Sequence, residues 1–326
     1  DSTCGLSARC CKPFEKDGLL VSLVREQGAI PFVRTNIPQC LMLPESFNAI
    51  WGTSRNPHDP ERTVGGSSGG EAGLIAARGS PLGLGGDIGG SIRIPAVLCG
   101  IVGLKPTAGR ISDEGIAVPR PGDRNGQNAI KSTAGPMGRS VADLALLMES
   151  WCRARMYEED LQIPQLPWST ELYVQARDAK RMKFGYYCCD GYFDPAPACA
   201  RAVREAVEAL RRAGHEVVEF PPLEMYEGAL LYVALMASDG SLHGIRSGLE
   251  GEELHKYYQF LYTLASMPGL LRSVAVPVVR RLMGQPRTAD LCSVGRGKST
   301  REFWALVGRR DELRKKLLAR WREAGI

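Results

Sequence analysis

Two clusters of glycine and serine are the residues in this sequence best suited to chemistry. The first is T-V-G-G-S-S-G-G-E at 63–71, and the second is G-L-G-G-D-I-G-G-S-I-R at 83–93. Glycine beside serine lets the backbone approach a ligand closely and present several N–H groups to it. Such groups suit a phosphate or the oxyanion of an acyl-transfer intermediate. Neither cluster matches the glycine-rich patterns of nucleotide-binding loops, and a pair of tight turns without a chemical role is the structural alternative.

The run G-S-S-G-G at 66–70 also fits the G-x-S-x-G pattern of a nucleophile elbow, with Ser68 as nucleophile. That chemistry needs an acid and a histidine further along the chain, and His215, His243 and His255 are available. His215 directly follows a glycine that ends a predicted helix, where a histidine is usually structural. A Ser-His-Asp hydrolase is therefore disfavoured.

Taken together, the two clusters resemble the signature of the amidase signature family of serine hydrolases. The run G-G-S-S-G-G-E is followed by D-I-G-G-S-I-R-I-P and then by C-G-I-V-G-L-K-P-T. The resemblance extends to P-F-V-R-T-N-I-P-Q (31–39), W-G-T-S-R-N-P (51–57) and A-G-P-M-G-R-S-V-A-D-L-A-L (134–146). It covers nearly the whole chain and is strongest to the members that hydrolyse fatty-acid amides.

The resemblance implies a Ser–Ser–Lys triad. Ser91 matches the nucleophile that attacks the amide carbonyl and becomes acylated. Ser67 matches the residue that passes a proton between base and nucleophile and then to the leaving amine, and Ser68 is its supporting neighbour. Four backbone N–H groups would form the oxyanion hole, those of Ile88, Gly89, Gly90 and Ser91.

Three further positions follow from the same resemblance. Leu41 and Met42 match positions that contact substrate, together with Ser67 and the oxyanion-hole residues. Both side chains are apolar, so they either line an acyl pocket or belong to the core, and the sequence leaves this open. Gly86 stands where related amidases commonly have threonine, a departure that would loosen the turn before Asp87.

The general base of the triad is expected outside this sequence. The resemblance places it at a lysine just upstream of Asp1, and Lys12, Lys16 and Lys105 do not occupy the matching position. Both ends also look internal, because the chain does not start with methionine. The last helix is followed by A-G-I, as if a strand were to begin at Ile326. A fragment with an incomplete triad is the expectation.

The recurring helix–glycine–strand pattern predicts an α/β domain. The resemblance implies one central, mixed, twisted sheet surrounded by helices, formed by residues 1–326 as a single domain. Strands are expected at 30–36, 182–187 and 215–220. Helices are expected at 14–27, 140–152, 197–213 and 301–323, and glycines end the first and third of them.

Composition sets further bounds. The 326 residues are 44% hydrophobic and carry a net charge of +5, which is too weakly basic to indicate nucleic-acid binding. Neither the ten cysteines nor the four histidines show metal-ligand spacing, and a reduced, cytosol-facing protein is expected. No signal peptide opens the sequence, and no apolar run of about 18 residues could span a membrane.

Residues 254–289 have an unusual composition. They contain lysine and arginine between many apolar residues but no Asp or Glu. This composition is typical of a segment that lies in a membrane interface, and the alternative is a buried hairpin whose arginines reach out to water. Pro268-Gly269 should divide it into two short helices. The resemblance favours a membrane-facing helical hairpin near 260–284.

The function implied by the resemblance is hydrolysis of fatty-acid amides, both primary amides and N-acyl ethanolamines, through an acyl-enzyme on Ser91. It also implies no metal or organic cofactor, a homodimer, and a location on intracellular, cytosol-facing membranes such as the endoplasmic reticulum. Two alternatives remain. One is a catalytically silent, membrane-associated binding protein of the same fold, and the other is a soluble amidase for small amides.

Overall fold

The computed structural model describes residues 1–119, 128–222, 224–240 and 243–326, apart from the side chains of Ile245, Arg246, Phe260, Leu261 and Leu264. The chain forms two compact units. Unit 1 comprises Asp1–Trp168 and His243–Gln259, and unit 2 comprises Ser169–Leu242 and Phe260–Ile326. Each unit is described by itself.

Unit 1 contains the two glycine–serine clusters. Its helices are α1 (Leu19–Glu26), α2 (Gly69–Ala76), α3 (Arg93–Cys99), α4 (Val141–Trp151), α5 (Ala154–Glu159) and α9 (His243–Ser247), with short 3-10 turns at Ser7–Arg9 and Gln39–Leu41. Its strands are β1 (Phe47–Asn48), β2 (Gly52–Thr53), β3 (Leu82–Asp87), β4 (Val102–Gly103) and β5 (Thr133–Gly138). The second cluster begins within β3, and the first leads into α2, which contacts β3.

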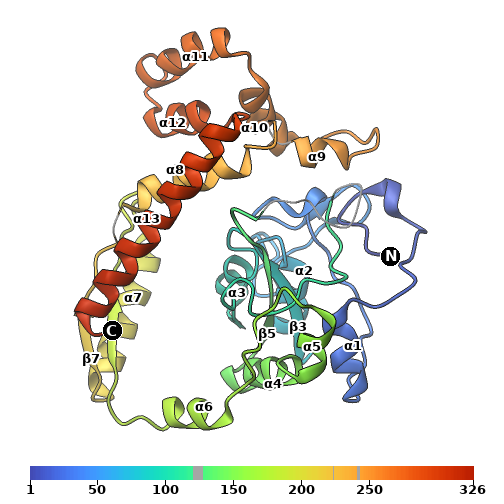
Figure 1. Ribbon diagram of the computed structural model, residues 1–326, viewed down its shortest axis with the longest axis vertical. Helices are drawn as coiled ribbons and strands as arrows, with labels where there is room; N and C mark the ends of the chain where they lie inside the picture. Colours follow the sequence, from blue (N-terminus) through green and yellow to red (C-terminus); the bar gives the residue numbers. More distant parts are fainter. Residues whose placement is uncertain (120–127, 223, 241–242) are drawn as a thin grey trace. The chain divides into compact units, whose positions relative to one another are not determined.

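That sheet has the order β3-β5-β4 and is antiparallel throughout, with Leu82 opposite Gly138 and Asp87 opposite Thr133. Helix α2 packs on β3 and β5, while α4 packs along β5 (Figure 1). The apolar side chains of the serine-bearing region form one buried cluster: Val64, Ala72, Ile75, Ile92, Cys99 and Met137. The two serine loops therefore rest on a common core.

A larger core in unit 1 joins its outer helices. Leu20 and Leu23 of α1 pack with Trp151 of α4 and Met156 of α5, and all four side chains are buried. Helix α4 begins at a capping box in which the Ser140 hydroxyl accepts the N–H of Asp143 at 3.2 Å. This core fixes β5, which α4 contacts directly.

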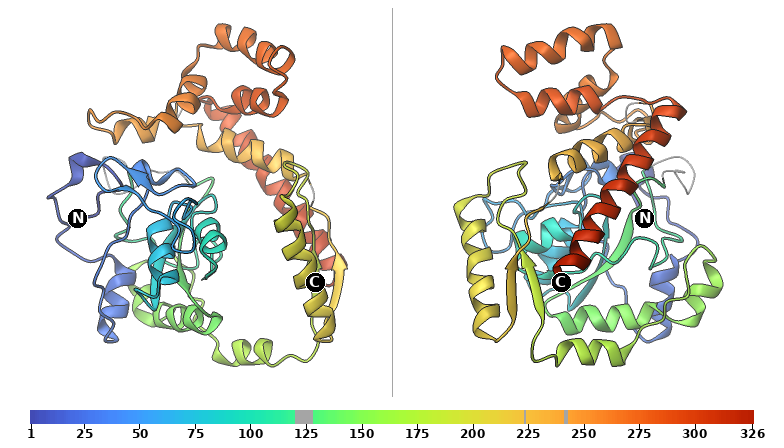
Figure 2. Two further views of the ribbon diagram at one scale, coloured as in Figure 1. Left: turned by 180° about the vertical axis from the view of Figure 1, so that it is seen from behind. Right: turned by 60° about the vertical axis from the view of Figure 1, so that its left-hand side comes forward.

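Unit 2 holds a parallel strand pair, β6 (Lys183–Tyr186) and β7 (Glu216–Glu219). Its helices are α6 (Thr170–Arg177), α7 (Pro197–Arg212), α8 (Met225–Met236), α11 (Gly269–Arg281), α12 (Pro286–Val294) and α13 (Thr300–Ala324). Helix α10 (Lys256–Ser266) begins in unit 1 and continues into unit 2. Helix α7 and the C-terminal end of α13 flank the strand pair (Figure 2), where the rings of Phe220 and Trp321 meet edge to face.

The α/β class is confirmed, with antiparallel and parallel pairing both present. Within the described residues the strands form three separate sheets rather than one central sheet. The strands expected at 182–187 and 215–220 and the helices expected at 140–152, 197–213 and 301–323 all form, within a few residues of the predicted ends. The first predicted helix starts only at Leu19, after Gly18.

The strand predicted at 30–36 is wrong for the described residues. This segment belongs to no strand or helix, and Ile30 and Phe32 are 83% and 62% exposed. A strand needs a neighbour to pair its N–H and C=O groups, and here the segment instead offers the carbonyl of Asn36 to Gly70 N–H at 3.0 Å. Among the described residues, no helix is both long and apolar enough to cross a bilayer.

Candidate active site

Ser67 and Ser68 lie in a tight turn that leads into α2, and both are 7% exposed. The Gly66–Ser67 peptide bond is cis. The Ser46 hydroxyl holds this turn, because it accepts the N–H of Gly69 at 3.1 Å and donates to the carbonyl of Gly65 at 2.9 Å. One buried hydroxyl outside both clusters thus fixes the backbone on either side of the two serines.

The glycines of the first cluster allow close backbone contacts. A Cβ at Gly66 would lie 2.6 Å from the Glu45 carbonyl oxygen, and one at Gly70 would lie 2.6 Å from the Asn36 carbonyl oxygen. Both neighbours are backbone atoms, which cannot yield as a flexible side chain can. These glycines are therefore required by packing, which gives a physical reason for the cluster that is independent of any ligand.

Ser91 lies in the turn between β3 and α3, and Asp87 organises that turn. The Asp87 carboxylate is fully buried and accepts the N–H of Gly90 at 2.9 Å and that of Ile92 at 3.2 Å. The Arg93 guanidinium adds two hydrogen bonds, from Nε at 3.0 Å and from Nη2 at 2.9 Å. Burial alone would raise the pKa of Asp87, but the hydrogen bonds from Arg93, Gly90 and Ile92 outweigh it and lower that pKa.

The backbone N–H groups around Ser91 divide into two kinds. That of Gly90 is bonded to Asp87, whereas those of Ile88, Gly89 and Ser91 donate to no residue that the structure describes. Gly90 has φ = +117° and a Cβ there would lie 2.8 Å from the Ile94 side chain, so glycine is needed at this position. Three of the four predicted oxyanion-hole donors are thus open, and the fourth is engaged in holding the turn.

The two serine loops are joined directly. The N–H of Ser68 donates to the carbonyl of Ser91 at 3.1 Å, and the Ser68 hydroxyl accepts the N–H of Gly86 at 3.3 Å. Ser68 therefore links the two loops through its backbone and its side chain. The hydroxyls of Ser67 and Ser91 make no hydrogen bond with the described residues. A Cβ at Gly86 would meet nothing within 4 Å, so glycine there is not required by space.

The histidines have other partners. His215 Nδ1 accepts the N–H of Met182 at 3.1 Å, and the His255 ring packs 4.6 Å from that of Phe47. His58 Nε2 lies 2.9 Å from the carbonyl of Cys99. In the part of the chain that the structure describes, no histidine hydrogen-bonds to Ser68. This arrangement gives the Ser-His-Asp alternative no support.

Among the described residues, no lysine completes the triad. Lys105 donates to the carbonyl of Pro106 at 2.9 Å, next to it in the chain. No lysine among residues 1–119, 128–222, 224–240 and 243–326 hydrogen-bonds to Ser67. The assignment of the base to a lysine N-terminal to Asp1 stays a prediction.

Leu41 and Met42 are held by a separate set of contacts. Leu41 packs against the buried cluster of Cys4, Leu6 and Cys40. The Tyr258 hydroxyl accepts the N–H of Met42 at 3.0 Å and donates to the carbonyl of Gln39 at 2.6 Å. The contacts of Leu41 are those of a core residue, and Met42, which is half-buried, has its backbone fixed by Tyr258.

Two features near the site were not apparent from the sequence. One is Ser46, which no motif singled out. The other is Glu71, half-buried in the first turn of α2, whose pKa is raised by desolvation although it accepts a hydrogen bond from Thr35 at 2.6 Å. The sequence did contain a signal for the turn at Asp87. Aspartate side chains commonly accept hydrogen bonds from backbone N–H groups a few residues further on, as Asp87 does from Gly90.

In the segment 254–289 the predicted break is present, because α10 ends at Ser266 and α11 begins at Gly269. Helix α11 packs against α12. Arg272 is 8% exposed and donates to the carbonyls of Ala265 and Met267 at 2.8 and 3.0 Å, so it does not reach out to water. Helix α11 also exposes apolar side chains, with Leu270 at 81% and Leu282, just beyond its end, at 82%.

The comparisons with known proteins identify the family. The Amidase family model matches residues 1–277. Fatty-acid amide hydrolase 1 of Sus scrofa is 38% identical over 99% of this chain and 54% of its own length. The vitamin D3 hydroxylase-associated protein of Gallus gallus is 37% identical over 90% of this chain and 62% of its own length.

Among solved structures, a fatty acid amide hydrolase superposes with a TM-score of 0.81 at 27% identity, covering 99% of this chain and 51% of that one. The chain belongs to the amidase family, a class of amide-bond hydrolases. Within that family it is similar to fatty-acid amide hydrolases, and it spans about half the length of the relatives it matches.

Proposed function

We propose that this chain carries the nucleophile and oxyanion hole of an amidase that hydrolyses fatty-acid amides through an acyl-enzyme on Ser91. The observation that carries the proposal is the set of open N–H groups of Ile88, Gly89 and Ser91 in a turn fixed by Asp87. Fixed donors that need not reorganise stabilise the negative oxygen of a tetrahedral intermediate far better than water does.

In the proposed reaction, the Ser91 oxygen attacks the amide carbonyl carbon while its proton passes to Ser67. The carbonyl oxygen becomes negative and binds the open N–H groups. When the C–N bond breaks, Ser67 delivers the proton to the leaving amine, and water then hydrolyses the acyl ester. An unassisted serine hydroxyl is too weak a nucleophile, so a base must accept the proton of Ser67, and we assign that base to a lysine N-terminal to Asp1.

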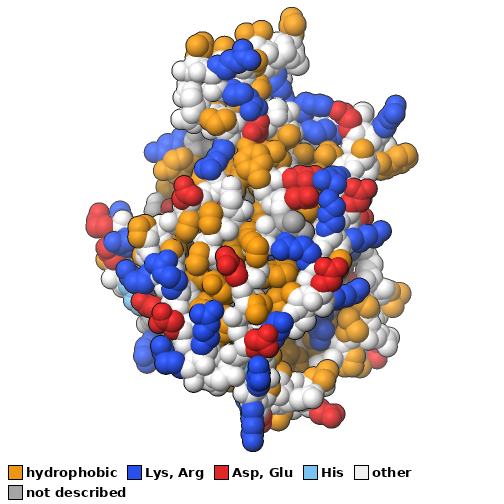
Figure 3. Space-filling view, turned by 90° about the vertical axis from the view of Figure 1, so that its left-hand side faces the viewer, with side chains coloured by type: hydrophobic (Ala, Val, Ile, Leu, Met, Phe, Trp, Pro, Cys, Tyr) orange, Lys and Arg blue, Asp and Glu red, His pale blue; other side chains and the backbone are white. Residues whose placement is uncertain are grey.

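The preference for lipid substrates rests on similarity to the fatty-acid amide hydrolases and on the surface of α11. Figure 3 shows hydrophobic and basic side chains together on the α11 and α12 part of the surface. We propose that this face lies in a membrane interface, where apolar side chains enter the lipid and arginines meet headgroups. Each buried CH₂ of an acyl chain contributes about 0.8 kcal/mol, so such substrates partition into the bilayer.

A fluorophosphonate probe, which labels activated serine nucleophiles, tests the proposal on the longest natural protein that contains this chain. We expect labelling at Ser91, loss of labelling in Ser91→Ala, and retained labelling in the control Ser293→Ala, which changes an exposed serine of α12. Absence of labelling in folded protein would instead favour a catalytically silent, membrane-associated binding protein of the same fold.

A further inference from the structure

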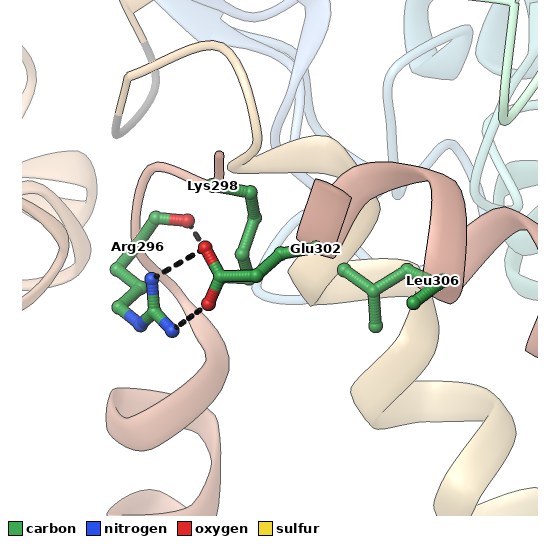
Figure 4. A pocket seen from close by; sticks show the side chains of 5 residues that line it. Arg296, Lys298, Glu302 and Leu306 are labelled. Atoms are coloured by element: carbon green, nitrogen blue, oxygen red, sulfur yellow. Dashed lines mark hydrogen bonds and ion pairs between the residues drawn. The ribbon is translucent and has the colours of Figure 1, made fainter. Parts of the chain in front are cut away.

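The charged side chains beside the pocket of unit 2 have a structural role. This pocket of about 340 Å³ lies beside the connection between α12 and α13, and Figure 4 shows Arg296 and Glu302 facing one another at its edge, where they form an ion pair. Lys298 donates from Nζ to the carbonyls of Val294 and Arg296 at 2.6 and 2.7 Å. These contacts join the end of α12 to the start of α13.

In unit 1, Tyr258 near the start of α10 bridges the backbone of a tight turn formed by residues 39–42. Its hydroxyl donates to the carbonyl of Gln39 at 2.6 Å and accepts the N–H of Met42 at 3.0 Å. In a β-turn these two groups, three residues apart, often bond to each other directly. Here the phenol hydroxyl stands between them. Tyr258 is 3% exposed, so the bridge is shielded from water.

The turn has a backbone conformation that needs support from its surroundings. Cys40 and Leu41, its two central residues, have φ of +57° and +61°. Two successive positive φ values characterise a type I′ turn, which asparagine and glycine normally occupy. Other residues keep such a conformation only where the surrounding structure overdetermines it. The N–H of Cys40 donates to the carbonyl of Cys4 at 2.9 Å, and the Tyr258 hydroxyl holds the turn at both of its ends.

The side chain of Gln39 attaches the same turn to the residues before α10. Its Nε2 donates to Glu252 Oε1 at 2.6 Å and to the carbonyl of Glu253 at 3.0 Å, and its Oε1 accepts the N–H of His255 at 2.9 Å. Gln39 is 3% exposed. Residues 252–258 therefore hold both the side chain and the backbone of Gln39, although 213 to 219 residues separate the bonded positions.

The turn lies between two contacts with the loop that carries Ser67. Before the turn, the carbonyl of Asn36 accepts the N–H of Gly70 at 3.0 Å. After it, the Ser46 hydroxyl accepts the N–H of Gly69 at 3.1 Å. Because the segment is fixed to this loop on either side, the conformation of the turn determines where its apolar side chains lie relative to the loop.

We propose that Tyr258 is a positioning residue that sets the acyl-chain preference of the Ser91 reaction by fixing Met42. The inference rests on the proposed function, since it assigns Met42, half-buried and on the segment fixed to the Ser67 loop, to the acyl side of that site. Tyr258 touches no reacting atom in this scheme. A long acyl chain gains binding free energy from each CH₂ that packs on an apolar side chain, whereas a short acyl group gains little.

The test compares the primary amides of oleic and butyric acid, using the longest natural protein that contains this chain. Tyr258→Phe removes the hydroxyl, so the carbonyl of Gln39 and the N–H of Met42 can close on each other and move Met42. We expect KM for the oleic amide to rise about fivefold with kcat nearly unchanged, because binding alone is weakened. KM for the butyric amide should stay the same. Tyr257→Phe is the matched control, since Tyr257 is 57% exposed and the change keeps its ring.

Two further variants test whether the effect passes through the turn. Glu252 accepts the N–H and hydroxyl of Ser7 at 2.6 and 2.5 Å in addition to its bond from Gln39, so Glu252→Gln turns an amide N–H toward one of these donors. It should raise KM for the oleic amide selectively, and it is made at a half-buried position that does not depend on the folding of Tyr258→Phe. In a Met42→Ala background, Tyr258→Phe should cause no further change in KM.

The outcomes separate this inference from the proposed function. Equal changes in KM for both amides, or an unchanged KM for the oleic amide in Tyr258→Phe and Glu252→Gln, would overturn the positioning role. Fluorophosphonate labelling of Ser91 in the unaltered protein is measured alongside. Without that labelling the proposed function fails and the inference fails with it, whereas labelling with an unchanged chain-length preference overturns the role of Tyr258 alone.

Discussion

Asp87 and Arg93 form a two-pronged ion pair in which a fully buried carboxylate meets a guanidinium whose side chain is 55% exposed. The same carboxylate holds the N–H groups of Gly90 and Ile92. Because these bonds enclose Ser91, the pair links a surface cation to the backbone conformation of the proposed nucleophile.

Asp87→Asn should therefore impair both folding and the site. An amide keeps one acceptor for Gly90 but turns an N–H toward Ile92 or Arg93, leaving buried donors without an acceptor. We expect the free energy of unfolding to fall by about 2 kcal/mol, measured by urea titration, and fluorophosphonate labelling of Ser91 to fall at least about tenfold. Asp59→Asn is the control, since Asp59 pairs with Arg62 at an exposed site. An Asp87→Asn protein with unchanged labelling would contradict the positioning role.

The pH dependence of stability follows from the lowered pKa of Asp87. A carboxyl group whose pKa is lower in the folded state stabilises the protein above its unfolded pKa, near 3.9, and this stabilisation is lost as the pH falls through the folded pKa. The stability difference between the unaltered protein and Asp87→Asn should thus be constant from about pH 5 to 7 and narrow below about pH 4. Urea titrations at a series of pH values measure this difference in unfolding free energy. A difference that grows as the pH falls would refute the lowered pKa of Asp87.

Substitution by alanine should affect stability differently at two glycines of the glycine–serine clusters. Gly70→Ala places a Cβ 2.6 Å from the Asn36 carbonyl oxygen, so the loop before α2 must shift. We expect a loss of more than about 2 kcal/mol in unfolding free energy. Gly86→Ala meets no atom within 4 Å and should be neutral or stabilise by about 0.5 kcal/mol. Thermal unfolding of the two variants, measured side by side, checks this difference in stability. Similar losses of stability in both would show that the space available to the added Cβ does not determine the effect.

The exposed face of α11 can be tested with vesicles. Leu270→Glu and Leu282→Glu should each weaken binding to vesicles with anionic lipid about tenfold, because burial of a leucine contributes roughly 1.5–3 kcal/mol. Leu161→Glu serves as the control, since Leu161 is 89% exposed but lies in unit 1. Co-sedimentation measures the bound fraction. Equal weakening in all three variants would indicate a non-specific charge effect.

The local sequence pattern predicted those helices whose C-termini are marked by a glycine. Helix α7 ends before Gly214 and α13 ends at Gly325, both with positive φ, as the sequence indicated. The strand predicted at 30–36 failed because pairing depends on neighbours that a local pattern does not contain. Likewise, the division of the strands into three sheets depends on contacts distant in sequence.

In the candidate site, too, the sequence predicted some features and not those that depend on three-dimensional contacts. The motif brought Ser67, Ser68 and Ser91 to attention, and the structure joins their loops through the Ser68 N–H and the Ser91 carbonyl. The sequence motif could not indicate that the Gly90 N–H donates to Asp87, because hydrogen-bond partners depend on the geometry of the turn. Ser46 was missed for a similar reason, since its two partners, Gly65 and Gly69, lie about twenty residues away.

The contact between Ser46 and Gly69 restricts how this turn can change in evolution. A Cβ at Gly69 would overlap the Ser46 hydroxyl and lie 2.8 Å from the Val64 side chain. A lineage that acquires alanine at position 69 must therefore also shorten the residue at position 46, and it then loses the hydroxyl that holds Gly65. The two positions should covary among relatives, with serine at one accompanying glycine at the other.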